Sequence, residues 1–373
     1  MLGALRFPVA ESRGRRYPEL PHPYRNPFQR DRDRILHSRA FRRLENKTQV
    51  FTSPISDHFR NRLTHSLEVS QVARTVAGVL GLDQDFTEAL ALVHDFGHPP
   101  FAHAGEDELD RQMQRFGETF DHNIHALRIV ETFEQRYARF PGLNLTFEVR
   151  EGMAKHSRDF EPGEFPLLDE YLPGLRPPLE AQLIDLADEI AYNTSDVDDG
   201  LAAGLFTVAD IGEAVPRYAE LSDMIEHQFP GATLREQFFE VLRLLLDALV
   251  TGLIQGTVEA AAGITNVDEV RRHPSRLVRF TASAAGTNAA LKTFLHARVY
   301  NSPALCDERL RSAGMVEWLF QFYLDHPDQL PADYVESAAA QPLHRAVCDY
   351  IAGMTDPFFL RTYQRLSATP GTG

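Results

Sequence analysis

The feature that most constrains the fold of this chain is the segment LEAQLIDLADEIAYNTSDVDDGL at 179 to 201, whose apolar residues recur at helical spacing. Side chains three and four residues apart lie on one face of an α-helix, and an apolar face has to be buried against other elements. The segment therefore predicts a long helix packed into a core. Its apolar stripe consists of Leu179, Leu183, Leu186, Ile190, Val197 and Leu201.

The same periodicity predicts helices elsewhere, and the expected fold class is all-α. Helical spacing occurs over 32–49, 64–81 and 83–98, and helical signal continues to about residue 365. Asp83 is a predicted N-cap of the third of these helices, which Gly97 and Pro99 interrupt. The best candidate for a β-strand is LNLTFEV at 143–149, and its pattern is ambiguous.

Prolines indicate how the chain is divided. Residues 1–29 carry prolines at 8, 18, 21, 23 and 27, which predicts an extended N-terminal arm. A second proline-rich stretch, 160–178, predicts a loop between two helical blocks. We expect one helical region over 30–205 that contains this loop, a C-terminal helical region over 206–366 packed on it, and a disordered tail over 367–373.

Composition and charge narrow the class of protein. Apolar residues make up 43% of the chain, yet no stretch approaches the ~18 consecutive apolar residues of a membrane-spanning helix, and the N-terminus lacks a signal-peptide pattern. These features predict a cytoplasmic protein without a membrane partner. The net charge is -15, but residues 1–65 contain 14 Arg or Lys and 6 Asp or Glu. This asymmetry suggests a local anion site, with a solvated basic arm as the alternative.

Histidines and aspartates form the most unusual constellation. His94 follows Leu90 at helical spacing and therefore points inward, with Asp95 beside it. A buried carboxylate costs several kcal/mol unless it is paired or binds a metal, although a hydrogen-bonded core histidine would be the ordinary explanation for His94 alone. His65 and Asp188 lie on two other predicted helices. Two imidazoles and two carboxylates suit Mn, Fe, Zn, Co or Mg, and the spacing leaves the metal open.

Six ordered motifs resemble the dGTPase-like deoxynucleoside triphosphate triphosphohydrolases of the HD phosphohydrolase superfamily. The resemblance spans roughly residues 25 to 360 and implies an HD-domain helical bundle with additional C-terminal helices. The motifs are RAFRRLENKTQVF at 39–51, RLTHSLEVSQVAR at 62–74, HDFGHPPFAHAGE at 94–106, FDHNIHALRIVE at 120–131, LEAQLIDLADEIAYNTSDVDDGL at 179–201 and DYIAGMTD at 349–356.

The resemblance implies a reaction and a set of catalytic roles. Family members cleave a dNTP between the α-phosphorus and the sugar 5′-oxygen, which releases a deoxynucleoside and inorganic triphosphate. His103 matches the family's catalytic histidine and would supply a proton to the leaving oxygen, with Glu106 orienting it. One divalent metal ion, Mn²⁺, Mg²⁺, Fe²⁺, Co²⁺ or Zn²⁺, would be held by His65, His94, Asp95 and Asp188.

Further positions match the family's substrate contacts. Arg62, His98 and His122 match residues that line the phosphates, and Gln49 and Val50 match the segment that checks the sugar. Tyr192 and Asp196 match residues that bracket the deoxyribose. The chain departs from the family pattern at Ala102, Ser195 and Phe96, and none of these changes removes a ligand.

The family also implies partners, and two other classes of function compete with it. Relatives form homo-oligomers such as tetramers or hexamers, and some are activated by a nucleotide bound between subunits. One alternative is another HD-type phosphohydrolase, acting on a nucleoside monophosphate, a cyclic nucleotide or an alarmone. The other is a nucleotide-sensing or single-stranded-DNA-binding protein with weak or conditional activity, which the basic N-terminal segment would support.

Overall fold

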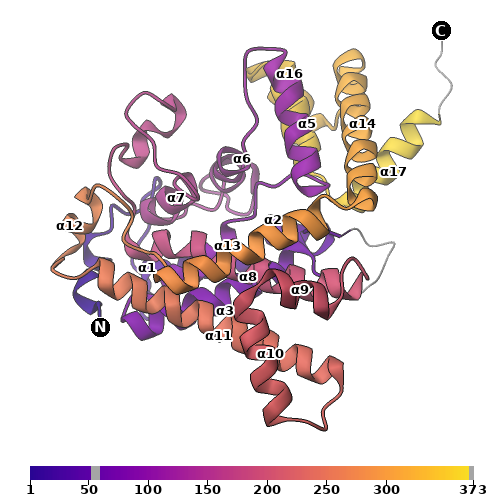
Figure 1. The fold of residues 1–373 in the computed structure, drawn as a ribbon. Coiled ribbons are helices and arrows are strands. Elements are labelled where there is room, and N and C mark those ends of the chain that lie inside the picture. Colours follow the sequence, from indigo (N-terminus) through magenta and orange to yellow (C-terminus); the bar gives the residue numbers. More distant parts are fainter. Residues whose placement is uncertain (52–58, 369–373) are drawn as a thin grey trace. The chain divides into compact units, whose positions relative to one another are not determined.

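The structure is a computed structural model that describes residues 1–51 and 59–368 (Figure 1). Over these two ranges the chain forms helices and no β-strand, only isolated bridges such as the one between Thr48 and Asn61. The predicted all-α fold class is confirmed. Residues 369–373 of the predicted disordered tail lie outside the described residues.

Two compact units make up the chain, and each is assembled from three separate stretches. Unit 1 comprises Met1–Arg34, His65–Leu92 and Leu145–Ser302, and unit 2 comprises Ile35–Thr64, Val93–Asn144 and Pro303–Gly373. Neither unit is continuous in sequence, whereas the prediction divides the chain into continuous regions at residues 29, 205 and 366. That division stays a prediction.

The long helix predicted over 179–201 is α8, which lies in unit 1 and buries Leu179, Leu183 and Ile190. Helices α11 and α13 pack on it. Gly252 lets these two helices approach closely, because a Cβ at this position would lie 2.3 Å from the Cβ of Ala284. The α-helices mainly in unit 1 are α1 (Pro27–Leu36), α3 (Arg62–Leu80), α4 (Gln84–Val93), α7 (Phe147–Ala154), α8 (Leu179–Ala202), α9 (Val208–Ala214), α10 (Pro216–Gln228), α11 (Leu234–Ala260), α12 (Val267–Arg272) and α13 (Ala282–Leu295).

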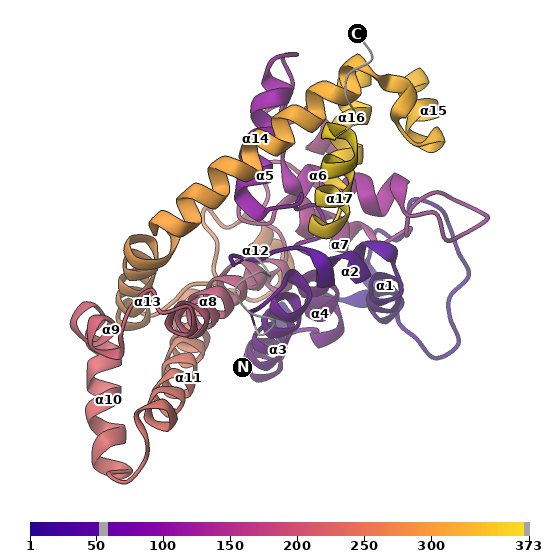
Figure 2. The ribbon, with the colours of Figure 1, turned by 90° about the vertical axis from the view of Figure 1, so that its right-hand side faces the viewer.

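Helix α11 is the one described helix that is long and apolar enough to cross a membrane, with a mean hydropathy of 1.6 over its most apolar window. Its inner face nevertheless packs in unit 1, where Val241, Leu245 and Leu249 are buried. Helix α10 runs beside it as the other arm of a hairpin (Figure 2). Core helices of soluble proteins can be equally long and apolar, so α11 is weak evidence for a membrane span.

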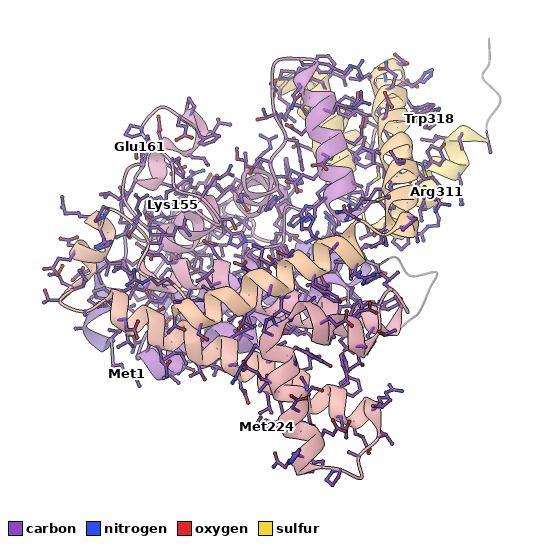
Figure 3. All side chains as sticks on the ribbon, viewed as in Figure 1. Met1, Lys155, Glu161, Met224, Arg311 and Trp318 are labelled. Atoms are coloured by element: carbon purple, nitrogen blue, oxygen red, sulfur yellow. The ribbon has the colours of Figure 1, made fainter. Side chains whose placement is uncertain are left out.

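The N-terminal residues are packed into unit 1. Phe7 and Phe28 are buried with Phe86 of α4, and the rings of Phe28 and Phe86 stack at 4.3 Å. The proline-rich stretch 160–178 is attached to α7 by the fully buried Lys155, which is labelled in Figure 3. Its ammonium donates to the carbonyl oxygens of Leu172 and Leu175 and to Glu151.

Unit 2 has its own core, in which α5, α14 and α16 lie side by side (Figure 1). Leu109 and Met113 of α5 pack with Phe320 of α14 and Ile351 of α16. Phe101 and Phe359 belong to the same cluster. The α-helices of unit 2 are α2 (Arg39–Arg43), α5 (Ala102–Gln114), α6 (His122–Arg128), α14 (Pro303–Asp325), α15 (Ala332–Ala340), α16 (Leu343–Ala352) and α17 (Asp356–Ser367).

Two predictions of local structure are corrected. The helix expected over 32–49 is divided into α1, α2 and a 3₁₀ turn, because the Ser38 side chain accepts from the Phe41 amide and starts a new helix. The strand candidate at 143–149 is wrong, since α7 begins at Phe147. Asp31 accepts from both the amide and the hydroxyl of Thr146, which holds the residue before this helix. The predicted N-cap is confirmed, because Asp83 accepts from the Phe86 amide.

Glu180 at the start of α8 generates a prediction about pH. Its side chain is fully buried and accepts from the amides of Phe7 and Asp83. Burial, which outweighs these donors, raises the pKa of Glu180 from 4.5 to about 7. The folded protein therefore binds this proton more tightly than the unfolded chain. The resulting stabilisation is complete below about pH 4.5 and is lost as pH rises through about 7.

Glu180→Gln should remove this pH dependence. We expect the free energy of unfolding of the parent protein to fall, relative to that of the variant, by up to about 3 kcal/mol between pH 5 and pH 8. Urea denaturation at the two pH values measures the difference. Glu226→Gln, at an exposed position of α10, is the control and should change nothing. A difference between Glu180→Gln and the parent that is the same at both pH values would contradict the assignment.

Candidate active site

The HDFGHPP motif forms a turn rather than the end of a helix. Helix α4 ends at Val93, so the expectation that helical structure continues through His94 and Asp95 is corrected. The amides of Phe96 and His98 donate to the carbonyls of Val93 and Asp95, and these bonds close the turn. Gly97 is required here, because a Cβ would lie 1.7 Å from the carbonyl oxygen of His122. The turn can therefore lie directly on the backbone of α6.

Asp95 is the electrostatic centre of this turn. Its buried carboxylate has one oxygen, Oδ1, 2.9 Å from Nη1 of Arg62, 3.1 Å from Nε2 of His98 and 3.5 Å from Nε2 of His94. Burial alone would raise the pKa of Asp95, but the Arg62 guanidinium and the histidines hold it well below its usual range. The other oxygen, Oδ2, is buried without a hydrogen-bond partner among the described residues. An ionised carboxylate with one bare oxygen fits a metal ligand.

Three histidines, His98, His103 and His122, lie around the carboxylate of Glu106 on α5. Its Oε1 lies 2.6 Å from Nδ1 of His122 and accepts from the His122 amide, and its Oε2 lies 3.6 Å from Nδ1 of His98. The rings of His98 and His122 stack at 4.0 Å. Burial opposes ionisation of Glu106, but the neighbouring imidazoles of His103 and His122, of which His122 is hydrogen-bonded to it, hold its pKa far below the usual range. Ligand atoms of His98, Glu106 and His122 all lie within 4.8 Å of one another, a spacing that suits a bound cation.

The histidines of this cluster differ in exposure. Burial, together with the positive charge of Arg62, holds the pKa of His98 well below 6.5, so His98 is neutral at pH 7. His103 stands in the first turn of α5 with its side chain 77% exposed, and its Nδ1 lies 3.8 Å from Glu106 Oε2. Glu106 is thus bound more closely to His122 than to His103. The prediction that Glu106 orients His103 stays a prediction, and His122 is a closer partner that the sequence did not indicate.

The segment predicted to check the sugar is joined to Arg62. The Arg62 amide donates to the Lys47 carbonyl, and Thr48 pairs with Asn61 in an antiparallel bridge. Gln49 and Val50 follow directly and are both partly buried. The Oε1 atom of Gln49 is buried and accepts no hydrogen bond from the described residues, which fits an acceptor awaiting a hydroxyl.

The remaining predicted residues lie in unit 1. His65 of α3 is buried, and its Nε2 lies 2.8 Å from Oδ1 of Asp188 on α8. Tyr192 and Asp196 follow Asp188 at intervals of four residues along the same helix, so the three side chains share one face. Burial and the charges of Glu189, Asp188 and Asp196 raise the pKa of the Tyr192 phenol, which therefore stays protonated.

The four predicted metal ligands are divided evenly. Each unit supplies one imidazole and one carboxylate: His65 with Asp188 in unit 1, and His94 with Asp95 in unit 2. Both pairs are mixed nitrogen and oxygen donor sets of the kind that binds divalent transition metals. The phosphate-contact candidates Arg62, His98 and His122 all belong to unit 2 together with His103 and Glu106.

Tyr300 is a residue that the sequence analysis missed. It ends the π-helical turn His296–Tyr300 that follows α13, and its hydroxyl donates to Oδ2 of Asp196. Burial and the negative charge of Asp196 raise its pKa, so the phenol remains a donor. No spacing rule relates residues this far apart in sequence, and the structure alone shows the pairing.

Comparison with known proteins finds two matching domain families and relatives that are similar over most of the chain. Residues 62–193 match the HD domain, and residues 278–365 match the phosphohydrolase-associated domain. Curated relatives share the description deoxyguanosinetriphosphate triphosphohydrolase-like protein. The relative from Geobacter sulfurreducens is 43% identical over 358 residues, covering 95% of this chain and 92% of its own length. That from Cereibacter sphaeroides is 43% identical over 385 residues, covering 98% and 100%, and that from Ralstonia nicotianae is 44% identical over 364, covering 96% and 93%.

The Tyr300 pairing generates a prediction about stability. Tyr300→Phe removes a donor to a buried carboxylate, and we expect the free energy of unfolding to fall by about 1.5–3 kcal/mol, as for hydrogen bonds to charged groups. Tyr218→Phe is the matched control. The Tyr218 hydroxyl is buried without a hydrogen-bond partner among the described residues, so its removal should be neutral or stabilising. Equal effects of the two substitutions in chemical denaturation would argue against the Tyr300 contact.

Proposed function

Because the chain belongs to the family of deoxyguanosinetriphosphate triphosphohydrolase-like proteins and contains an HD domain, we propose that it hydrolyses deoxynucleoside triphosphates to deoxynucleoside and inorganic triphosphate. The observation that carries this proposal is the cluster in unit 2. A buried, ionised Asp95 with one bare oxygen lies beside Arg62 and His98, and an ionised Glu106 holds a histidine on the other side of His98. Such a cluster provides ligands for a cation, donors for phosphate and a proton donor together.

One divalent ion is part of the proposal. His65, His94, Asp95 and Asp188 would hold it, and their two imidazoles and two carboxylates suit Mn²⁺, Mg²⁺, Fe²⁺, Co²⁺ or Zn²⁺. When bound, such an ion polarises a phosphoryl group and makes a water molecule more acidic.

The other side chains would bind the substrate and move a proton. Arg62 binds a phosphate oxygen with its guanidinium fork, and His98 lines the phosphates beside it. His103 donates its proton to the sugar 5′-oxygen as the bond to the α-phosphorus breaks, because an alkoxide is a poor leaving group. His122, held on Glu106, contacts the phosphates and is a second candidate for this proton donor.

Recognition of the sugar would use Gln49, Val50, Tyr192 and Asp196. Gln49 accepts from the 3′-hydroxyl while Val50 packs against the ring, and Tyr192 and Asp196 bracket the deoxyribose from α8. A site whose polar groups are already satisfied leaves no partner for a 2′-hydroxyl and rejects ribonucleotides by about 10²-fold or more.

Further parts of the proposal concern the state of the protein in the cell. We propose a cytoplasmic homo-oligomer, tetramer or hexamer, with a nucleotide activator bound between subunits. The alternative of a single-stranded-DNA-binding protein has less support, because many arginines of the basic N-terminal segment are paired with carboxylates. Such pairs are Arg6 with Asp83, Arg15 with Asp31, Arg25 with Asp33, Arg32 with Asp85 and Arg34 with Glu19.

The product of the reaction tests the function. We expect the metal-loaded protein to release deoxynucleoside and triphosphate in equal amounts from at least one dNTP, offered singly or in a mixture of all four. Release only from the mixture would indicate activation by a second nucleotide. Orthophosphate or pyrophosphate as the product would favour another HD-type phosphohydrolase. DNA binding that falls steeply with salt, without turnover of any nucleotide, would favour the binding protein.

Substitutions separate the metal ligands from the proton donor. Asp188→Ala should lose both bound metal and turnover, because it removes one of the carboxylate ligands. His103→Ala should keep the metal, measured by elemental analysis, and lower kcat by about 10²- to 10⁴-fold. His122→Ala is the comparison. If it lowers kcat more than His103→Ala and flattens the alkaline limb of the pH profile, where a proton donor loses its proton, His122 is the proton donor and the assignment of His103 is wrong.

A further inference from the structure

The turn that precedes the HAGE sequence is held in a strained backbone conformation. Phe101 and Ala102 have φ angles of 64° and 52°, in the left-handed region that residues other than glycine rarely adopt. Gly105 packs against the turn, since a Cβ there would lie 2.0 Å from the Pro100 carbonyl oxygen. Two consecutive strained residues persist only where their surroundings hold them. They lie between His98 and His103, so whatever holds them also determines where both histidines point.

Asp356, at the start of α17, supplies such a restraint. Its carboxylate is buried and bridges two segments: Oδ1 accepts from the Phe101 amide at 3.2 Å, and Oδ2 accepts from the Thr48 amide at 2.9 Å. The ring of Phe359, one turn further along α17, packs edge-on against the Phe101 ring at 4.9 Å. The two amide donors belong to the segment that carries Gln49 and to the turn that carries His98.

Lys47 forms a second tie between the same parts of unit 2. Its side chain is 3% exposed, and its ammonium donates to the carbonyl oxygens of His98 and of Ala352, the last residue of α16. Residues 352–359 therefore contact both segments twice, through the Ala352 carbonyl and through Asp356 and Phe359. This part of the chain includes the end of the DYIAGMTD motif, to which the function proposed above assigns no role.

We propose that Asp356 is a positioning residue, whose single carboxylate sets the register between the sugar-checking segment Lys47–Phe51 and the histidine turn 98–103. The inference rests on the proposed function and deepens it. One oxygen keeps Phe101 in its left-handed conformation and so directs His98 and His103 toward the phosphates and the leaving oxygen. The other oxygen holds Thr48 and so places the neighbouring Gln49 against the 3′-hydroxyl.

The chain offers a matched control within the same motif. Asp349 is also buried in unit 2, but its carboxylate pairs with Arg128 and Gln341. Asp349→Asn therefore removes a buried charge from the motif while leaving the amides of Thr48 and Phe101 on Asp356. Asp356→Asn keeps the shape of the side chain but turns one acceptor into an NH₂ donor, which cannot accept from an amide.

Amide hydrogen exchange of the full-length chain directly tests the two hydrogen bonds that Asp356 accepts from Thr48 and Phe101. In Asp356→Asn we expect exchange at Thr48 or Phe101, whichever faces the new NH₂ group, to accelerate at least tenfold over the parent, whereas Asp349→Asn leaves both amides protected. Unchanged exchange in Asp356→Asn would overturn the proposal. This measurement needs no turnover, so it tests the hydrogen bonds to Asp356 even if the parent protein releases no triphosphate. Absence of triphosphate release would instead refute the proposed function.

Kinetics then test the consequence for the reaction. The readout is the ratio of kcat/KM for the preferred dNTP to that for its 2′,3′-dideoxy counterpart, which lacks the hydroxyl assigned to Gln49. Asp356→Asn should keep its bound metal and lose about 10- to 100-fold in kcat, because misplaced groups lose catalytic advantage. It should also lower this ratio if hydrogen exchange shows that the Thr48 amide is the one released. Asp349→Asn should keep the parent's ratio. Parent-like kcat in Asp356→Asn, an unchanged ratio when the Thr48 amide is released, or an equally lowered ratio in Asp349→Asn would overturn the positioning role.

A milder variant covers the case in which Asp356→Asn does not fold. Phe359→Leu removes the ring contact with Phe101 and leaves the carboxylate on Thr48 in place. We expect kcat to fall several-fold with no change in the preference for the 3′-hydroxyl. Parent-like kcat in Phe359→Leu would show that the C-terminal segment does not control the histidine turn. A lowered 3′-hydroxyl preference would contradict the assignment of one Asp356 oxygen to Phe101 and the other to Thr48.

Discussion

A carboxylate buried in a protein keeps its charge only if cations or hydrogen-bond donors surround it, and this requirement organises the site in unit 2. Asp95 is 4% exposed and stays ionised because Arg62 and the histidines of its own turn lie within a few ångströms. Glu106 is ionised for the same reason, through His103 and His122. The two carboxylates account for the density of histidines between residues 94 and 122. They also leave one oxygen of Asp95 available to a cation.

Close backbone approach is the second constraint, and it depends on residues without chemistry of their own. Gly97 lets the HDFGHPP turn lie on the backbone of α6, which brings the ring of His98 onto that of His122. Gly105 lets α5 begin directly against Pro100. The strained residues Phe101 and Ala102 connect these two contacts, and α17 holds them from outside the motif. The histidine motif is therefore hydrogen-bonded to a C-terminal segment more than 250 residues away.

Much of the fold could be predicted because helices follow local rules. The stripe of α8 and the N-cap Asp83 depend on residues within a turn or two of one another, and both were found from spacing. The errors occurred where a distant group decides the outcome. The segment 143–149 has the sequence pattern of a strand. In the structure, however, Asp31 accepts from the Thr146 hydroxyl and α7 begins at Phe147. The helical spacing also extends α4 beyond Val93, because it does not record that the following turn packs on α6.

The candidate site divides in the same way. The sequence by itself determined the all-α class, the residue types that can bind a metal and phosphates, and the helix face shared by Asp188, Tyr192 and Asp196, because these follow from composition and a period of 3.6 residues. Only the tertiary structure decided that Glu106 lies closer to His122 than to His103, that Tyr300 donates to Asp196, and that Asp356 joins Thr48 to Phe101. Hydrogen bonds and charge pairs act over a few ångströms of space, and no local pattern records which distant residues the packing of helices will bring within that range.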